Sequence, residues 1–151
     1  MHKLNTGVNE EILKEIELKL HIQFPQIYKD FLQMCNGGGL FIPGTVLSES
    51  YIPFNAPKKR GVSYLNDSFY PERRPVGLPD RYLIIADLNY GDTICIDLMA
   101  SNMYDAPIIQ WDKDMKDISR SWCGLVEWIM DELEEGSLLV DYDGEEKDLD
   151  F

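Results

Sequence analysis

The chain of 151 residues carries a formal net charge of −13, so its length fits one domain and its charge disfavours unaided binding to nucleic acid or to an anionic membrane. The charge is uneven: residues 1–81 hold 10 basic and 9 acidic side chains, whereas residues 82–151 hold 4 basic and 18 acidic ones. This asymmetry favours a basic protein partner for the second half. An acidic surface that only keeps the protein soluble is the simpler explanation of the composition alone.

The sequence has no apolar run near the ~20 residues that span a bilayer, and its first residues lack the apolar centre of a signal peptide. Its cysteines, Cys35, Cys95 and Cys123, form no CxxC pair and each follows or precedes apolar residues. They are therefore predicted to be buried free thiols in a reducing compartment. We expect a cytoplasmic protein.

Two helices are predicted near the N-terminus. Asn9 is a good N-cap, and Glu10 and Glu11 place negative charge in the first turn, which predicts a helix over residues 9–20. Pro25 is well placed as the first residue of a second helix. This second helix has apolar residues at helical spacing, which are Ile27, Tyr28, Phe31, Leu32 and Cys35.

The glycines of "CNGGGL", residues 35–40, allow two interpretations. A glycine-rich loop that opens a helix can hold a phosphate group, but these glycines follow a helix and no GK[ST] motif comes after them. We therefore interpret Asn36, Gly37 and Gly38, with Gly39, as a structural turn from helix to strand. In this turn Asn36-Gly37 ends the helix with a positive φ.

Residues 40–81 show the least regular pattern. A short strand pair at residues 41–49, a basic loop and an irregular helix near residues 62–73 are the elements that the sequence favours. Prolines and a glycine crowd the stretch before Arg81 and predict an irregular connection. Arg73, Arg74 and Arg81 could bind an anion, although solvated charges are commoner in loops.

The pattern becomes regular again in the second half. Residues 82–86 and 93–98 are rich in β-branched and apolar side chains and flank the turn "DLNYGD", which predicts a β-hairpin. Residues 107–111 predict a further strand. Ser121 is expected to cap a long helix that Gly136 ends, with an apolar stripe made of Trp122, Leu125, Val126, Ile129 and Leu133.

The C-terminal end is expected to differ from the rest. Residues 137–142, "SLLVDY", favour a short strand, and the acidic residues after it favour a frayed segment. We therefore expect one domain over residues 1–140 and a flexible acidic tail over residues 141–151.

Several stretches together resemble the SUKH superfamily. "FPQIYKDFLQMCNGG" is similar to its helix pair, "YLIIADLNYGDTICIDL" to its central hairpin, "PIIQWDKD" to its next strand, and "SWCGLVEWI" to its closing helix. Phe24 stands where leucine is usual and Trp122 where phenylalanine is usual, and both changes keep the apolar pattern. The resemblance covers about residues 8–135, and residues 41–75 match only loosely.

This resemblance implies an α+β fold with helices packed on a mostly antiparallel sheet. It also implies a binding role without catalysis. Bacterial members of the superfamily are immunity proteins that block a toxin, often a nuclease, and fungal members regulate cell-wall synthesis and signalling. The superfamily supplies no catalytic residue to carry over.

The residues themselves do not suggest an enzyme. The two histidines, His2 and His21, have no paired nucleophile at a known spacing, and no GxSxG motif occurs. Residues 139–150 only partly match a calcium loop, because Leu139 and Asp150 stand where Asp and Glu are needed. No cofactor and no metal are therefore expected.

The candidate partner-binding residues are acidic side chains at strand ends and one tryptophan. They are Asp87, Asp92, Asp112, Asp114 and Trp128. The alternative for each aspartate is a role in forming a turn, and for the tryptophan a place in the core. We expect these residues to bind a basic toxin domain, which makes the protein an immunity protein; a regulatory module that binds a cellular partner is the alternative.

Overall fold

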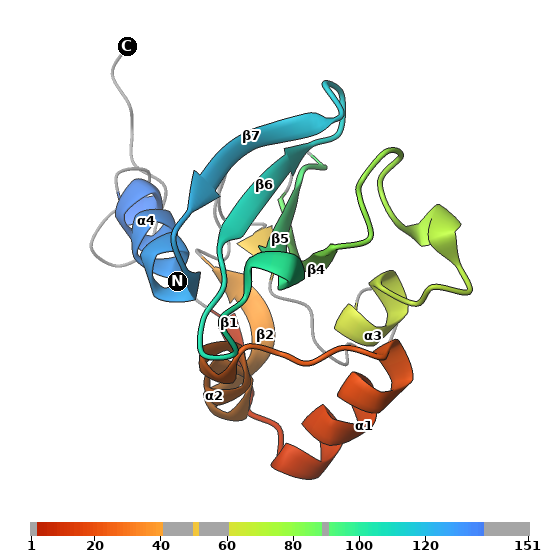
Figure 1. The fold of residues 1–151 in the computed structure, drawn as a ribbon. Helices are drawn as coiled ribbons and strands as arrows, with labels where there is room; N and C mark the ends of the chain where they lie inside the picture. Colours follow the sequence, from red (N-terminus) through yellow and green to blue (C-terminus); the bar gives the residue numbers. More distant parts are fainter. Residues whose placement is uncertain (1–2, 41–49, 52–60, 89–90, 138–151) are drawn as a thin grey trace.

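The computed structural model describes residues 3–40, 50–51, 61–88 and 91–137, which form an antiparallel sheet with helices packed against it (Figure 1). In chain order the elements are β1 (Lys3–Thr6), α1 (Glu10–Leu20), α2 (Gln26–Met34), β2 (Cys35–Leu40), β3 (Ser50–Tyr51), α3 (Val62–Leu65), the 3-10 helix η1 (Pro71–Arg73), β4 (Tyr82–Asp87), β5 (Thr93–Asp97), the 3-10 helix η2 (Leu98–Ala100), β6 (Ile108–Asp112), β7 (Asp117–Trp122) and α4 (Leu125–Ser137).

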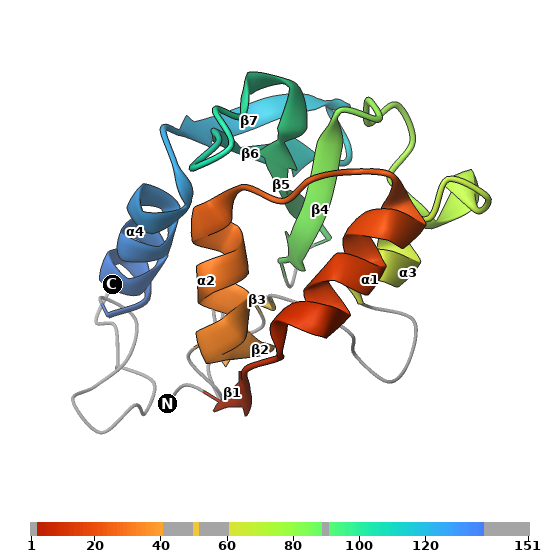
Figure 2. The same ribbon diagram turned by 60° about the horizontal axis from the view of Figure 1, so that its bottom comes forward.

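The sheet follows the order of the chain from β1 to β7, and each strand pairs antiparallel with the next. The helices α1 and α2 connect the paired strands β1 and β2. Figure 2 shows α4, α2 and α1 spread across one side of the sheet. This arrangement confirms the predicted α+β fold, and both strands of the predicted hairpin and the strand after it are present.

Alternation along the strands produces an apolar layer on each face of the sheet. The layer beneath the helices contains Leu83, Ile94, Ile96 and Ile108 from the strands and Leu13, Tyr28, Leu32 and Trp128 from the helices. The layer on the opposite face contains Ile84, Cys95, Ile109 and Trp111, with Leu65 and Leu78 packed on them. Each fully buried aliphatic side chain stabilises the fold by about 1.5–3 kcal/mol, so the two layers together hold the sheet in place.

The first helix begins as the sequence predicts. The Asn9 side chain accepts a hydrogen bond of 3.0 Å from the Ile12 backbone N–H, which satisfies one of the unpaired amides of the first turn. The helix ends at Leu20, where His21 takes a left-handed conformation with φ of 56°. The chain then turns toward α2.

The predictions for α2 and the glycines need correction. Pro25 precedes the helix as its N-cap, and the helix ends at Met34 because Cys35 is already extended. Asn36, Gly37 and Gly38 are not a turn but part of β2, which pairs with β1. The predicted positive φ is present, at 71° for Gly37 and 130° for Gly38. These glycines therefore allow β2 to adopt backbone angles that are unusual in a strand, and they do not end a helix.

The prediction for the C-terminal helix was also wrong at both ends. Ser121 and Trp122 belong to β7, a strand that the sequence pattern did not reveal, and α4 starts only at Leu125. Trp122 belongs to the core although it comes from the strand. Its distance of three residues from Leu125 made it look like part of a helical stripe. Gly136 lies inside α4 and does not end it.

Some expectations concern residues outside the described ranges. These are the strand and turn after Leu40, the basic loop before Gly61, the strand expected after Ser137 and the acidic tail. The domain boundary at residue 140 therefore stays a prediction.

Candidate interaction surfaces

The turns that carry the predicted aspartates lie at the same end of the sheet. The β4–β5 turn follows Asp87, and the β6–β7 turn follows Asp112. Because Thr93 of β5 pairs with Trp111 of β6, the start of β5 and the end of β6 are neighbours. The sequence analysis placed these carboxylates at strand ends, and the structure adds that the two turns lie side by side.

Two of these aspartates are engaged within the fold. Asp92 is only 7% exposed, and its carboxylate accepts hydrogen bonds of 3.2 Å from the Gln110 side-chain amide and from the Lys113 backbone N–H. Asp112 accepts hydrogen bonds of 2.9 Å from the backbone N–H groups of Asp114 and Met115. Asp92 therefore ties the two turns together, and Asp112 shapes its own turn, as the alternative interpretation expected.

Asp114 differs from the other predicted aspartates because it is exposed, whereas Asp87 and Asp112 are half-buried. Its surroundings are not strongly acidic, since Lys113 and Lys116 flank it in the β6–β7 turn. Asp117, which begins β7, is exposed as well, so two exposed carboxylates alternate with two lysines here and do not form an acidic surface.

Trp128 does not lie on the surface. Its side chain is 0% exposed and belongs to the core between α4 and the sheet. Helix α4 buries Leu125, Trp128 and Glu132 on one face, a stripe rotated from the one that the sequence suggested. Trp128 is therefore a core residue and cannot serve as an exposed anchor for a partner.

Helix α4 is fixed to β7 by a cluster of charged and aromatic side chains. The Arg120 guanidinium contacts carboxylate oxygens of Asp131 at 2.7 Å and Glu135 at 2.8 Å, and it lies over the Trp122 ring at 4.9 Å. The Trp122 indole donates a hydrogen bond of 2.8 Å to Asp131. The hydrogen bond to Glu135 raises the pKa of Arg120 further above its ordinary value. The cluster thus holds two carboxylates of α4 in a fixed position.

Glu132 is the buried acid of this helix. It is 5% exposed, and one of its carboxylate oxygens has no hydrogen-bond partner among the described residues. Burial raises the pKa of this carboxyl from 4.5 to about 7, and repulsion from Glu135 adds to the shift. Near neutral pH this part of the core therefore contains a group on the edge of ionisation.

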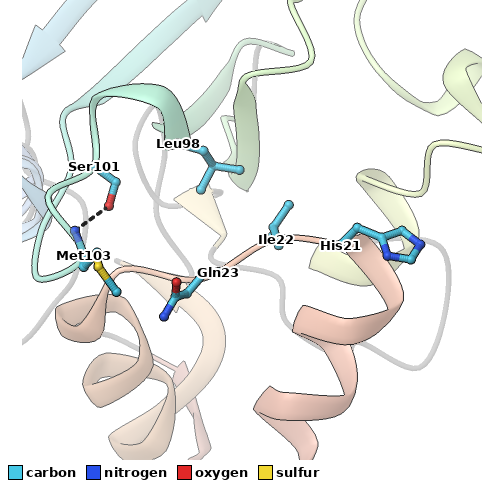
Figure 3. A pocket seen from close by; sticks show the side chains of 6 residues that line it. All are labelled: His21, Ile22, Gln23, Leu98, Ser101 and Met103. Atoms are coloured by element: carbon cyan, nitrogen blue, oxygen red, sulfur yellow. Dashed lines mark hydrogen bonds between the residues drawn. The ribbon is translucent and has the colours of Figure 1, made fainter.

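A cavity of about 320 Å³ lies between the α1–α2 connection and the segment after β5 (Figure 3). Ile22 and Leu98 also line a neighbouring hollow of about 180 Å³, and the two adjoining hollows are together called the groove. The six residues that line the larger cavity are His21, Ile22, Gln23, Leu98, Ser101 and Met103. His21 is the only titratable side chain among them, and the Ser101 hydroxyl accepts a hydrogen bond from the Met103 N–H. This lining offers shape and apolar contact rather than acid–base chemistry.

The three arginines of the candidate anion site, Arg73, Arg74 and Arg81, are occupied by contacts within the fold. Arg73 stacks between the Tyr64 and Tyr70 rings, at 3.6 and 3.7 Å from their centroids. Arg74 donates to the side chain of Asn66 at 2.8 Å and to backbone oxygens. Arg81 forms a two-point contact with Asp97, at 2.9 and 2.7 Å. They stabilise the irregular segment before β4, so they are neither an anion site nor merely solvated.

Cysteine and metal chemistry have little support within the described residues. Cys35 and Cys95 are buried free thiols as predicted, but Cys123 is exposed, and its pKa is raised because it lies beside Glu127. No group of three or more His, Cys, Asp and Glu side chains in this part of the chain is arranged to hold a metal ion. No helix found there is long and apolar enough to cross a bilayer.

The family model of the SMI1 / KNR4 family (SUKH-1) matches residues 7–131. This chain belongs to the SMI1/KNR4 family. Membership confirms the resemblance to the SUKH superfamily and supports an immunity or regulatory protein-interaction role. It also makes a protein the expected kind of partner.

For this SMI1/KNR4 family member, the structure points to surface residues that the sequence analysis did not single out. Met99, Met103 and Tyr104 are exposed beside the groove, and Val126 and Met130 are exposed on α4. The helical spacing of α4 predicts a buried Val126, because Val126, Ile129 and Leu133 share one side of the helix, so this spacing does not reveal the exposed residues. The groove brings together segments far apart in sequence, so no local pattern predicts it.

Proposed function

We propose that this protein is a non-catalytic immunity protein that binds a basic toxin domain, a nuclease, in the cytoplasm of the cell that makes it. Family membership supports a protein-binding role. The observation that carries the finer proposal is the charge of the second half. Residues 82–137 hold 12 acidic and 3 basic side chains, so most of the asymmetry lies within the domain and not in the acidic residues after it.

The mechanism follows from electrostatics. A nuclease must present a cationic surface to the phosphates of its substrate, and an acidic protein can occupy that surface because its field is complementary. Inhibition then requires only that the complex covers the surface where the nucleic acid would bind. No residue of this chain has to take part in a chemical step.

A regulatory interaction module is the second candidate. It is favoured by Met103, which lines the groove, and by the exposed side chains of Met99 and Tyr104 in the same segment, because methionine-rich surfaces adapt to different partners. A partner that uses this surface would not need a high positive charge.

Expression beside a toxin tests the first candidate directly. We expect cells that produce the toxin domain encoded next to this gene to grow only when this protein is also produced, and the two proteins to copurify. Continued toxicity with both proteins present, or a chromosomal neighbourhood without a toxin, would favour the regulatory module.

A further inference from the structure

Helix α4 has an exposed face that combines apolar and acidic side chains. Val126 is 53% exposed and Met130 is 61% exposed, and their spacing of four residues places them next to each other on the helix surface. Glu127 and Glu134 are also exposed, and helical geometry puts them beside Met130. The opposite side of the helix holds the buried stripe, so these four residues point away from the core.

The charged residues of helix α4 itself are all acidic. Helix α4 contains Glu127, Asp131, Glu132, Glu134 and Glu135 and no basic residue. The cation that the structure places against the helix is Arg120, which is held between Asp131 and Glu135. The apolar pair is therefore bordered by carboxylates, an arrangement in which the apolar centre supplies contact area and the charged border selects the partner.

The position of this face is well fixed. The Asp105 carboxylate accepts a hydrogen bond of 3.2 Å from the Leu125 backbone N–H at the start of the helix, and it lies so close to Gly124 that a side chain there would collide with it. Arg120 and Trp122 hold the other side of the helix to β7. A surface that is already rigid loses little entropy when it binds.

We propose that this face of α4, made of Val126, Glu127, Met130 and Glu134, is the surface that contacts the basic toxin domain. This inference rests on the proposed function and assigns it a place on the molecule. A second copy of the chain fits poorly, because two such faces would bring like charges together. The acidic border also disfavours nucleic acid and anionic lipid, which leaves a basic protein as the occupant.

The test compares matched variants on two helices. Met130→Ser and Glu134→Lys change the proposed surface, whereas Leu18→Ser and Glu15→Lys make the same changes at exposed positions of α1. Figure 2 shows α1 and α4 at opposite sides of the molecule. The probe is the toxin domain encoded beside the gene, inactivated by substitution, and the readout is the Kd from calorimetry.

We expect each α4 variant to raise the Kd by about tenfold or more and each α1 variant to change it by less than about threefold. All four positions are exposed, so circular dichroism should show intact folds. A toxin domain that binds the wild type and both sets of variants equally would overturn the inference but leave the proposed function standing. A toxin domain that does not bind the wild type would overturn both.

A second measurement uses Cys123, which is exposed and whose backbone N–H donates to Glu127. A photoreactive maleimide attached there should cross-link to the inactivated toxin domain, and unlabelled protein should compete. The same label on a Cys123→Ser, Glu15→Cys variant should not cross-link. Cross-linking from α1 alone would place the partner elsewhere and overturn the inference.

Discussion

The backbone oxygen of Met103 accepts a hydrogen bond of 2.9 Å from the backbone N–H of Gln26. Tyr104 accepts a similar bond from Ile27, and Pro25 provides no side-chain cap. The segment after β5 therefore satisfies the first amides of α2. Met103 reaches this position with φ of 72°, which also places its side chain at the groove of Figure 3.

The first prediction concerns this strained position. A non-glycine residue in the left-handed region costs about 1–2 kcal/mol, so Met103→Gly should raise the free energy of unfolding by about 0.5–1 kcal/mol. Met103→Val should lower it by about 1 kcal/mol or more, because β-branched residues fit this region poorly. Urea denaturation monitored by tryptophan fluorescence measures both changes.

Met99→Gly is the control for Met103→Gly. Met99 is exposed in the same segment, but its φ is not positive, so glycine there should destabilise by about 0.5–1 kcal/mol through the entropy of the unfolded chain. Equal effects of the two glycine substitutions would show that Met103 stores no strain.

The second prediction concerns Glu132. Its pKa is about 7 in the folded protein against 4.5 for an ordinary glutamate, so the unfolded chain releases its proton first as the pH rises. The folded state therefore loses stability between pH 4.5 and 7, and the loss is constant above pH 7. Glu132→Gln should remove this loss and stabilise the protein at pH 8 by about 1–3 kcal/mol relative to wild type.

The comparison between pH values distinguishes ionisation from packing. At pH 4.5 the advantage of Glu132→Gln should be much smaller, because the wild-type carboxyl is then largely protonated when folded. A constant difference for Glu132→Gln across this range would mean that the carboxyl does not titrate in the core.

The third prediction concerns Gly37. Its φ of 71° within β2 means that Gly37→Ala should lower the free energy of unfolding by about 1 kcal/mol or more. The variant and the wild type should both fail to bind ATP or GTP in a calorimetric titration. Nucleotide binding that the substitution abolishes would revive the phosphate interpretation of the glycines.

Local signals in the sequence were sufficient for much of this fold. The Asn9 cap, the stripe of α2 and the β4–β5 hairpin depend on neighbours in the chain, and each is present. The strand β7 was missed because "DISRSW" has few apolar residues, and an exposed strand at the end of a sheet needs none. Strand β1 was missed because its pairing with β2 depends on residues 29 to 36 positions away.

The candidate site was harder to predict than the fold. The sequence placed the aspartates at strand ends, but it could not show that their turns are neighbours or that Asp92 is buried against Gln110. The exposed residues of α4 could not be predicted without knowing which face of the helix is buried. The predicted stripe ran through Trp122 and Val126, but Trp122 belongs to β7 and the helix buries Leu125, Trp128 and Glu132. Val126 and Met130 are therefore exposed.

The last prediction concerns the rate of binding to the proposed toxin domain. Attraction between an acidic protein and a basic one speeds their encounter, and salt weakens it as the Debye length falls from ~30 Å at 0.01 M to ~8 Å at 0.15 M. We therefore expect the association rate in stopped-flow fluorescence to fall steeply over this range. The dissociation rate should change much less, because it depends mainly on close contacts.

Single charge reversals should show which part of the chain creates this attraction. Asp114→Lys, at the exposed turn after β6, should slow association more than Glu11→Lys, which lies in the first turn of α1. Deleting residues 143–151 should lower the association rate modestly and leave dissociation nearly unchanged, because these residues add negative charge. An association rate that does not respond to salt would show that the charge asymmetry serves solubility alone.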